Sequence, residues 1–154
     1  MALTRFTGPV QSGDKIVGDP NGPNVGFVIL EQQIALPQSG VGTTDFQLYV
    51  PAGSIINTID VDVLTAYDSA TSATLSIGAS AGGTDYASGV SLKTAGRTSP
   101  TYTAAQLAAM SGVTVLGAAA PVAPLVNFRV VTVGATANGY VLVTLKYIQQ
   151  TSSN

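Results

Sequence analysis

The chain has 154 residues, a length that favours one domain over two. It contains no cysteine and no histidine, which excludes disulfides, thiolate metal sites and histidine-based catalysis. Only 9% of its residues are charged and its formal net charge is −2, so it lacks the basic patch of a nucleic-acid-binding protein. These features favour a β-rich structural or binding protein over an enzyme, with no cofactor, no metal and no nucleic-acid partner.

The first 24 residues differ from the rest, because they combine four glycines and three prolines with no sustained apolar period. This composition predicts an extended N-terminal arm, and a frayed terminus is the alternative. Apolar side chains favour an arm that docks on a partner, since a solvated tail has no need of them. The candidate contact residues are Phe6, Val10, Ile16 and Val17.

From residue 25 onward the pattern is that of short strands in a single β-sandwich domain, residues 25–154. Apolar and β-branched runs alternate with turn residues at the spacing typical of sandwiches and jelly rolls. The predicted strands are 25–36, 45–50, 55–66, 73–79, 86–92, 113–116, 126–133 and 140–148. The fold class that follows is all-β: a jelly-roll-like antiparallel β-sandwich with one short helix and an extended N-terminal arm.

Period-two alternation assigns side chains to the two faces of each strand. In 55–66 the inner face receives four branched residues: Ile55, Ile59, Val61 and Val63. Asp60 and Asp62 fall on the opposite face. In the last two strands apolar residues occupy the second face as well, which indicates burial against something beyond the chain's own core. These residues are Val131, Val133, Val141 and Val143.

Local signals place one helix and one turn. Thr103 and Gln106 have the spacing of a capping box, which predicts a short helix over 104–111. Asn138-Gly139 is typical of hairpin turns and indicates that the last two strands are a closing pair. The longest apolar run, 113–126, is broken by prolines and is too short to span a bilayer, so we expect no membrane partner.

Three groups of residues resemble functional sites, namely a serine nucleophile, a calcium site and a sugar-binding platform. Each has a simpler structural explanation. Gly78–Gly82 matches the G-x-S-x-G pattern around Ser80, but no helix pattern follows and the chain has no histidine base, so a small-residue turn is favoured. Asp60 and Asp62, with Asp68 in the next loop, supply too few oxygen ligands for calcium and are interpreted as solvated carboxylates. The six tyrosines are spread along the chain, which disfavours an aromatic platform for sugars.

Three stretches carry a resemblance to a known family. The segment from Phe46 to Tyr86, FQLYVPAGSIINTIDVDVLTAYDSATSATLSIGASAGGTDY, resembles small β-sandwich virion proteins of tailed bacteriophages. The segment 138–148, NGYVLVTLKYI, resembles the last strand of the same proteins. The opening Phe6-Thr-Gly-Pro-Val10, followed by Ser12-Gly13, is similar to the start of head decoration (cement) proteins.

The resemblance implies a structural virion protein that binds the outer surface of a phage capsid and stabilises the head. It implies the major capsid protein as partner, a homotrimer as the assembled unit, and a place on the capsid exterior after synthesis in the host cytoplasm. It supplies no catalytic, cofactor-binding or metal residues. The alternative function is a tail- or fibre-associated virion module that binds host surface glycan.

Overall fold

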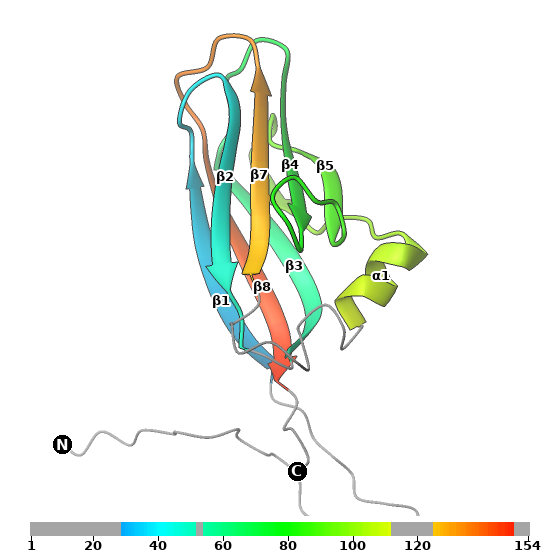
Figure 1. Ribbon diagram of the computed structural model, residues 1–154. Helices are drawn as coiled ribbons and strands as arrows, with labels where there is room; N and C mark the ends of the chain where they lie inside the picture. The colour runs from blue at the N-terminus through cyan, green and yellow to red at the C-terminus, as the bar shows by residue number, and fades with distance from the viewer. Residues whose placement is uncertain (1–28, 52–53, 112–124, 150–154) are drawn as a thin grey trace, which may run out of the picture.

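The computed structural model describes residues 29–51, 54–111 and 125–149, which form eight strands and one short helix (Figure 1). In chain order these elements are β1 (Ile29–Pro37), β2 (Gly42–Tyr49), β3 (Ser54–Thr65), β4 (Ser72–Gly78), β5 (Ala87–Ser91), β6 (Gly96–Thr98), α1 (Ala104–Ser111), β7 (Leu125–Val133) and β8 (Tyr140–Gln149). Eight of these nine elements match a predicted element in place and type, although β2 begins three residues before its predicted start; β6 was not predicted. The predicted strand 113–116 lies outside the described residues.

The strands pair in a nested order that defines the fold. β1 pairs with β8, β2 with β7, β3 with β6 and β4 with β5, all antiparallel, as in one long hairpin whose tip lies between β4 and β5. Rolling that hairpin adds the pairs β3–β8 and β4–β7. The result is two four-stranded sheets, β1-β8-β3-β6 (sheet A) and β2-β7-β4-β5 (sheet B). This arrangement is a jelly roll, as predicted.

The closing pair predicted from Asn138-Gly139 is wrong, because β7 lies in sheet B and β8 in sheet A. Residues 134–139 therefore cross from one sheet to the other. Gly134 has a φ of +87°, a conformation that favours glycine. A Cβ on Gly139 would overlap the ring of Tyr67, so this crossover also requires a glycine at its second end.

The core lies between the sheets and differs from the predicted one at β3. A register shift between Ile56 and Thr58 marks a bulge, so that Ile56 faces the core and Ile55 faces outward. Beyond the bulge, the predicted inner residues of β3 are buried as expected. The prediction for β8 is also corrected: Val141 and Val143 are fully buried in the core and do not lie on its outer face.

Helix α1 begins with the capping box that the sequence predicts. The Gln106 amide N–H donates to Thr103 Oγ1 over 3.2 Å, and the Thr103 N–H donates to Gln106 Oε1 over 2.9 Å. Gln106 also donates from Nε2 to the carbonyl of Thr84 over 3.1 Å, which ties the helix to the β4–β5 connection. Among the described helices, none is long and apolar enough to cross a membrane.

The two ends of the sandwich carry different loops and chain ends (Figure 1). We call the end at which β1 begins and β8 ends the lower end; there Ile29 pairs with Ile148. The opposite, upper end carries the loops 38–41, 66–71 and 134–139. Residues 1–28 precede β1 in the chain, so the predicted arm joins the described domain at the lower end.

The edge of β3 is protected by a side chain. Because β6 pairs only with Val61–Val63, the backbone of Ile59 has no strand partner on that side. The hydroxyl of Tyr102 accepts a hydrogen bond from the Ile59 N–H over 3.1 Å and donates one to the Ile59 carbonyl over 3.2 Å. One phenol thus occupies the backbone N–H and carbonyl of Ile59 that another strand would otherwise pair with.

We expect Tyr102→Phe to lower the free energy of unfolding by about 1–3 kcal/mol, because both backbone groups of Ile59 lose their partner. Chemical denaturation measures this loss. Tyr49→Phe is the matched control, since the Tyr49 side chain is exposed, and it should change stability by less than about 0.5 kcal/mol. Equal stability of the two variants would show that water replaces the Tyr102 hydroxyl without cost.

Candidate functional site

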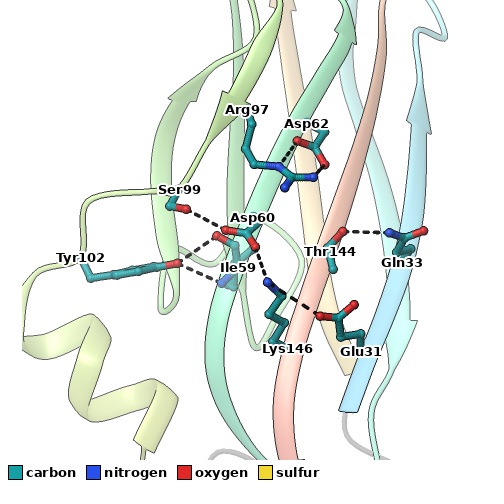
Figure 2. Close-up of polar contacts among 10 residues, drawn as sticks. All are labelled: Glu31, Gln33, Ile59, Asp60, Asp62, Arg97, Ser99, Tyr102, Thr144 and Lys146. Carbon is teal, nitrogen blue, oxygen red and sulfur yellow. Dashed lines mark hydrogen bonds and ion pairs between the residues drawn. The ribbon is translucent and has the colours of Figure 1, made fainter. Parts of the chain in front are cut away.

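The outer face of sheet A carries a band of charged side chains that are paired with one another (Figure 2). Alternation along β3 directs Asp60 and Asp62 to this face, and β6 places Arg97 directly opposite Asp62. Arg97 binds Asp62 through two nitrogens, at 2.6 Å and 2.8 Å. Lys146 Nζ lies 3.0 Å from Asp60 Oδ2 and 3.8 Å from Glu31 Oε1.

This pairing determines what the two aspartates can do. A hydrogen bond from Ser99, followed by that from Lys146, lowers the pKa of Asp60. The Arg97 hydrogen bonds lower the pKa of Asp62. Both carboxylates are therefore ionised and engaged with donors at neutral pH, instead of being simply solvated as the sequence suggested. In the described ranges, no group of three or more acidic side chains is placed to hold a metal ion.

The outer face of sheet B has one comparable pair. Asp45 on β2 lies directly opposite Arg129 on β7, and two hydrogen bonds of 2.7 Å join them. These bonds lower the pKa of Asp45. Around this pair the exposed residues of β2 and β4 are mostly uncharged and polar. The Asp45–Arg129 pair on sheet B is neutral, and in the band on sheet A each cation is paired with at least one carboxylate.

The G-x-S-x-G segment forms a tight turn, as the sequence analysis favoured. The Gly83 N–H donates to the Ser80 carbonyl over 2.9 Å, and the Ala79 N–H donates to Asp85 Oδ2 over 2.9 Å. A Cβ on Gly78 would overlap the backbone of Gly83, so the turn folds closely onto the end of β4. The segment leads into β5 and not into a helix, so Ser80 lacks the strand-to-helix turn of a nucleophile elbow.

The six tyrosines have separate roles and form no common platform. Three are buried in the core: Tyr67, Tyr86 and Tyr147. Burial raises the pKa of Tyr86 to about 12. Tyr102 is bound to β3, which leaves Tyr49 at the lower end and Tyr140 at the upper end as the exposed rings, 59% and 39% accessible. These two lie at opposite ends of the sandwich and cannot bind one sugar chain side by side.

The loops of the upper end are held by Asp68. Its Oδ1 accepts hydrogen bonds from Thr136 Oγ1 at 2.9 Å, from the Ala137 N–H at 2.8 Å and from the Asn138 N–H at 3.1 Å. Its Oδ2 accepts one from Asn138 Nδ2 at 3.0 Å. These donors, led by the backbone amides of Asn138 and Ala137, hold the pKa of Asp68 well below its usual range. One carboxylate thus fixes the crossover between the sheets.

We expect the protein to lose stability in acid, because folding lowers the pKa of Asp45, Asp60, Asp62 and Asp68. Stability from a lowered pKa is fully present above the unfolded value, about 3.9, and is lost as the pH falls through the lower folded value. Tm measured against pH should therefore be level from neutral pH down to about 5 and fall below about 4.

The variant Asp68→Asn measures how much the hydrogen bonds of Asp68 to residues 136–138 contribute to stability. This variant should have a lower Tm than the wild type at pH 7, and the difference should shrink in acid, where the wild-type carboxyl is protonated as well. A Tm equal to that of the wild type at pH 7 would contradict the stated role of Asp68.

The predicted capsid-contact residues, Phe6, Val10, Ile16 and Val17, lie outside the described residues. The described chain nevertheless carries exposed apolar side chains where the arm joins it. Ile29 is 50% and Leu30 37% exposed at the start of β1, and Tyr49 is exposed at the same end. Sequence reasoning missed these residues, because it predicted 25–36 as a strand but had no means of identifying β1 as an edge of its sheet.

Comparison with protein-family models, with curated proteins and with solved structures found no match.

Proposed function

We propose that this chain is a structural virion protein that binds the outer surface of a phage capsid and stabilises the head. The resemblance of Phe46–Tyr86 and 138–148 to small phage virion proteins supports it. The observation that carries it furthest is the apolar surface at the lower end, where Ile29 and Leu30 are exposed next to the arm. Exposed apolar side chains that follow a segment with apolar contact residues in the sequence are compatible with a contact surface.

The arm is the proposed latch to the shell. Each large apolar side chain removed from water, such as Phe6 or Ile16, contributes roughly 1.5–3 kcal/mol. Ordering the arm costs about 1–2 kcal/mol per residue, which offsets most of that gain. Affinity per copy is therefore modest, and many copies on one shell stabilise it collectively.

The proposed partner is the major capsid protein, and the proposed assembly is a homotrimer on the capsid exterior. Apolar residues on the outer faces of β7 and β8 would support such an assembly, but two of the four predicted ones, Val141 and Val143, belong to the core. Val133 remains exposed on the outer face of sheet B, with Val131 beside it on the same face. The pairing of cations with carboxylates on both outer faces is also compatible with closely packed copies.

Binding to heads that lack the protein tests this proposal. Purified chain should co-sediment with such heads, saturate at a fixed number of copies in groups of three, and raise the temperature at which the heads break. Leu30→Glu, which places a charge at the lower end, should reduce occupancy. Leu64→Glu is the matched control, because Leu64 is 60% exposed at the upper end. Full occupancy by both variants would exclude the lower end as the contact surface.

A second candidate function is a tail- or fibre-associated module that binds host surface glycan. One observation favours it: the half-exposed ring of Tyr140 lies beside uncharged polar groups at the upper end. Binding of the purified chain to a glycan array tests it. Heads that remain undecorated, together with specific glycan binding, would favour this function over the first.

A further inference from the structure

We propose that a shallow cavity at the upper end of the sandwich binds one neutral sugar residue. The cavity measures about 250 Å³ and is lined by Tyr140, Pro37, Gln38, Thr65 and the 137–139 segment. It is smaller than the pockets of about 300–1,000 Å³ that hold drug-sized ligands, a size that suits a single ring. This site rests on the second candidate function and not on capsid binding.

The register of sheet A builds the apolar part of the cavity. Pro37 on β1 and Thr65 on β3 both pair with Tyr140 on β8, so the three side chains come from neighbouring strands at the same level. Tyr140 keeps 39% of its residue surface accessible. A half-exposed aromatic ring offers a flat apolar surface, which matches the C–H face of a sugar.

The polar groups are arranged to accept hydrogen bonds. Gln38 uses its Nε2 to donate to the Thr136 carbonyl over 3.2 Å, and Asn138 uses its Nδ2 to donate to Asp68. Each of these bonds uses one of the two N–H groups of the amide, and the side-chain carbonyl oxygens of Gln38 and Asn138 are acceptors, while the Thr65 hydroxyl adds a group that accepts or donates. A ligand rich in hydroxyl donors matches this set.

The lining of the cavity disfavours anionic ligands. None of the residues that line the cavity is charged. The nearest carboxylate, Asp68, has both oxygens engaged by the 136–138 segment. An anionic ligand would lose hydration without gaining an opposite charge, whereas a neutral sugar exchanges hydrogen bonds with water at little cost.

The cavity is also rigid before any ligand binds. Asp68 fixes residues 136–138, and the Gln38 N–H donates to the Gly139 carbonyl over 2.9 Å. Beneath them Gly139 packs on the buried ring of Tyr67, whose hydroxyl donates to the Leu36 carbonyl over 3.0 Å. A pre-organised site loses little conformational entropy on binding, which allows a small ligand to bind measurably.

Titration with a panel of neutral methyl glycosides, followed by protein NMR, tests this site. At least one glycoside should bind with a Kd of about millimolar, the range expected for a ligand of this size, and should shift the resonances of Tyr140 and Asn138. An array of neutral and acidic oligosaccharides then shows whether the ligand is a free monosaccharide or the terminal residue of a longer glycan.

Variants locate the binding. Tyr140→Ala should weaken it about tenfold, as loss of an aromatic contact does, and Tyr140→Phe should retain it. Thr65→Val should weaken it several-fold by removing a hydroxyl. Tyr49→Ala, the matched control at the lower end, should bind as the wild type does. Tyr140→Ala should bind heads to the same extent as the wild type, whatever that extent is, so the sugar site and the capsid proposal fail separately. Absence of binding to every glycoside, or wild-type binding by Tyr140→Ala, would overturn the proposal.

Discussion

Replacing Phe128 with alanine should lower the free energy of unfolding by about 3–5 kcal/mol, the largest single effect on stability that we expect. Phe128 is fully buried in β7, directly between Phe46 on β2 and Ile77 on β4. Its removal leaves a cavity at the centre of sheet B that close-packed neighbours cannot fill. Because domains of this kind are stable by only about 5–15 kcal/mol, the variant should be marginally folded at 37 °C.

Urea denaturation of the two proteins measures this effect. Leu107→Ala on α1 is the matched control, because Leu107 is 51% exposed and alanine favours the helix. The control should change the free energy of unfolding by less than about 0.5 kcal/mol. A loss below about 1 kcal/mol for Phe128→Ala would show that the sheets do not pack around this ring.

Deleting residues 2–20 should abolish decoration of heads and leave the sandwich folded. The deletion removes all four proposed contact residues, Phe6, Val10, Ile16 and Val17, yet ends well before β1 begins at Ile29. Fully extended, the 24-residue arm reaches roughly 80 Å at about 3.3 Å per residue, far enough to cross to a neighbour. Loss of such an arm removes the latch without touching the core.

Two measurements on the truncated protein separate these effects. Its Tm should lie within a few degrees of the wild-type value, and its occupancy on heads should fall to background. Replacing the four contact residues with serine in the full-length chain is the matched control for arm length, and it should give the same loss. Wild-type occupancy by the truncated protein would move the latch to the described sandwich.

Much of the fold follows from local sequence, because local signals specify individual strands. Alternation in 45–50 correctly assigns Phe46 and Leu48 to the core face of β2, and the capping box of Thr103 and Gln106 correctly begins α1. Short strands separated by turn residues at regular spacing also suffice to predict a sandwich. These features depend on near neighbours in the chain, which a single sequence displays.

The errors arise where structure depends on distant residues. The bulge at Asn57 exchanges the faces of Ile55 and Ile56, and no local signal marks it. The crossover at 134–139 has the Asn-Gly sequence of a hairpin turn. Its glycines instead allow close packing on Ala70 and Tyr67, where the chain passes from one sheet to the other. The pairing of β8 with β3 and of β7 with β4, and not the sequence of the turn between β7 and β8, decides which sheet each strand joins.

The charged band on sheet A could be predicted only in part from the sequence, because its ion pairs also join distant residues. Alternation places Asp60 and Asp62 on the outer face, but their partners Lys146 and Arg97 come from β8 and β6, far away in the sequence. The role of Asp68 likewise depends on a loop nearly 70 residues later. Residues of this kind can be found from sequence only when strand pairing is already known.

Electron cryomicroscopy of heads purified with and without this protein is the most direct test of its proposed function. We predict added density on the outer surface of the shell, in groups of three sandwiches, with each lower end against the capsid and its arm following the shell. Density confined to the tail, or identical heads in the two preparations, would contradict the proposal that this jelly roll is a capsid decoration protein.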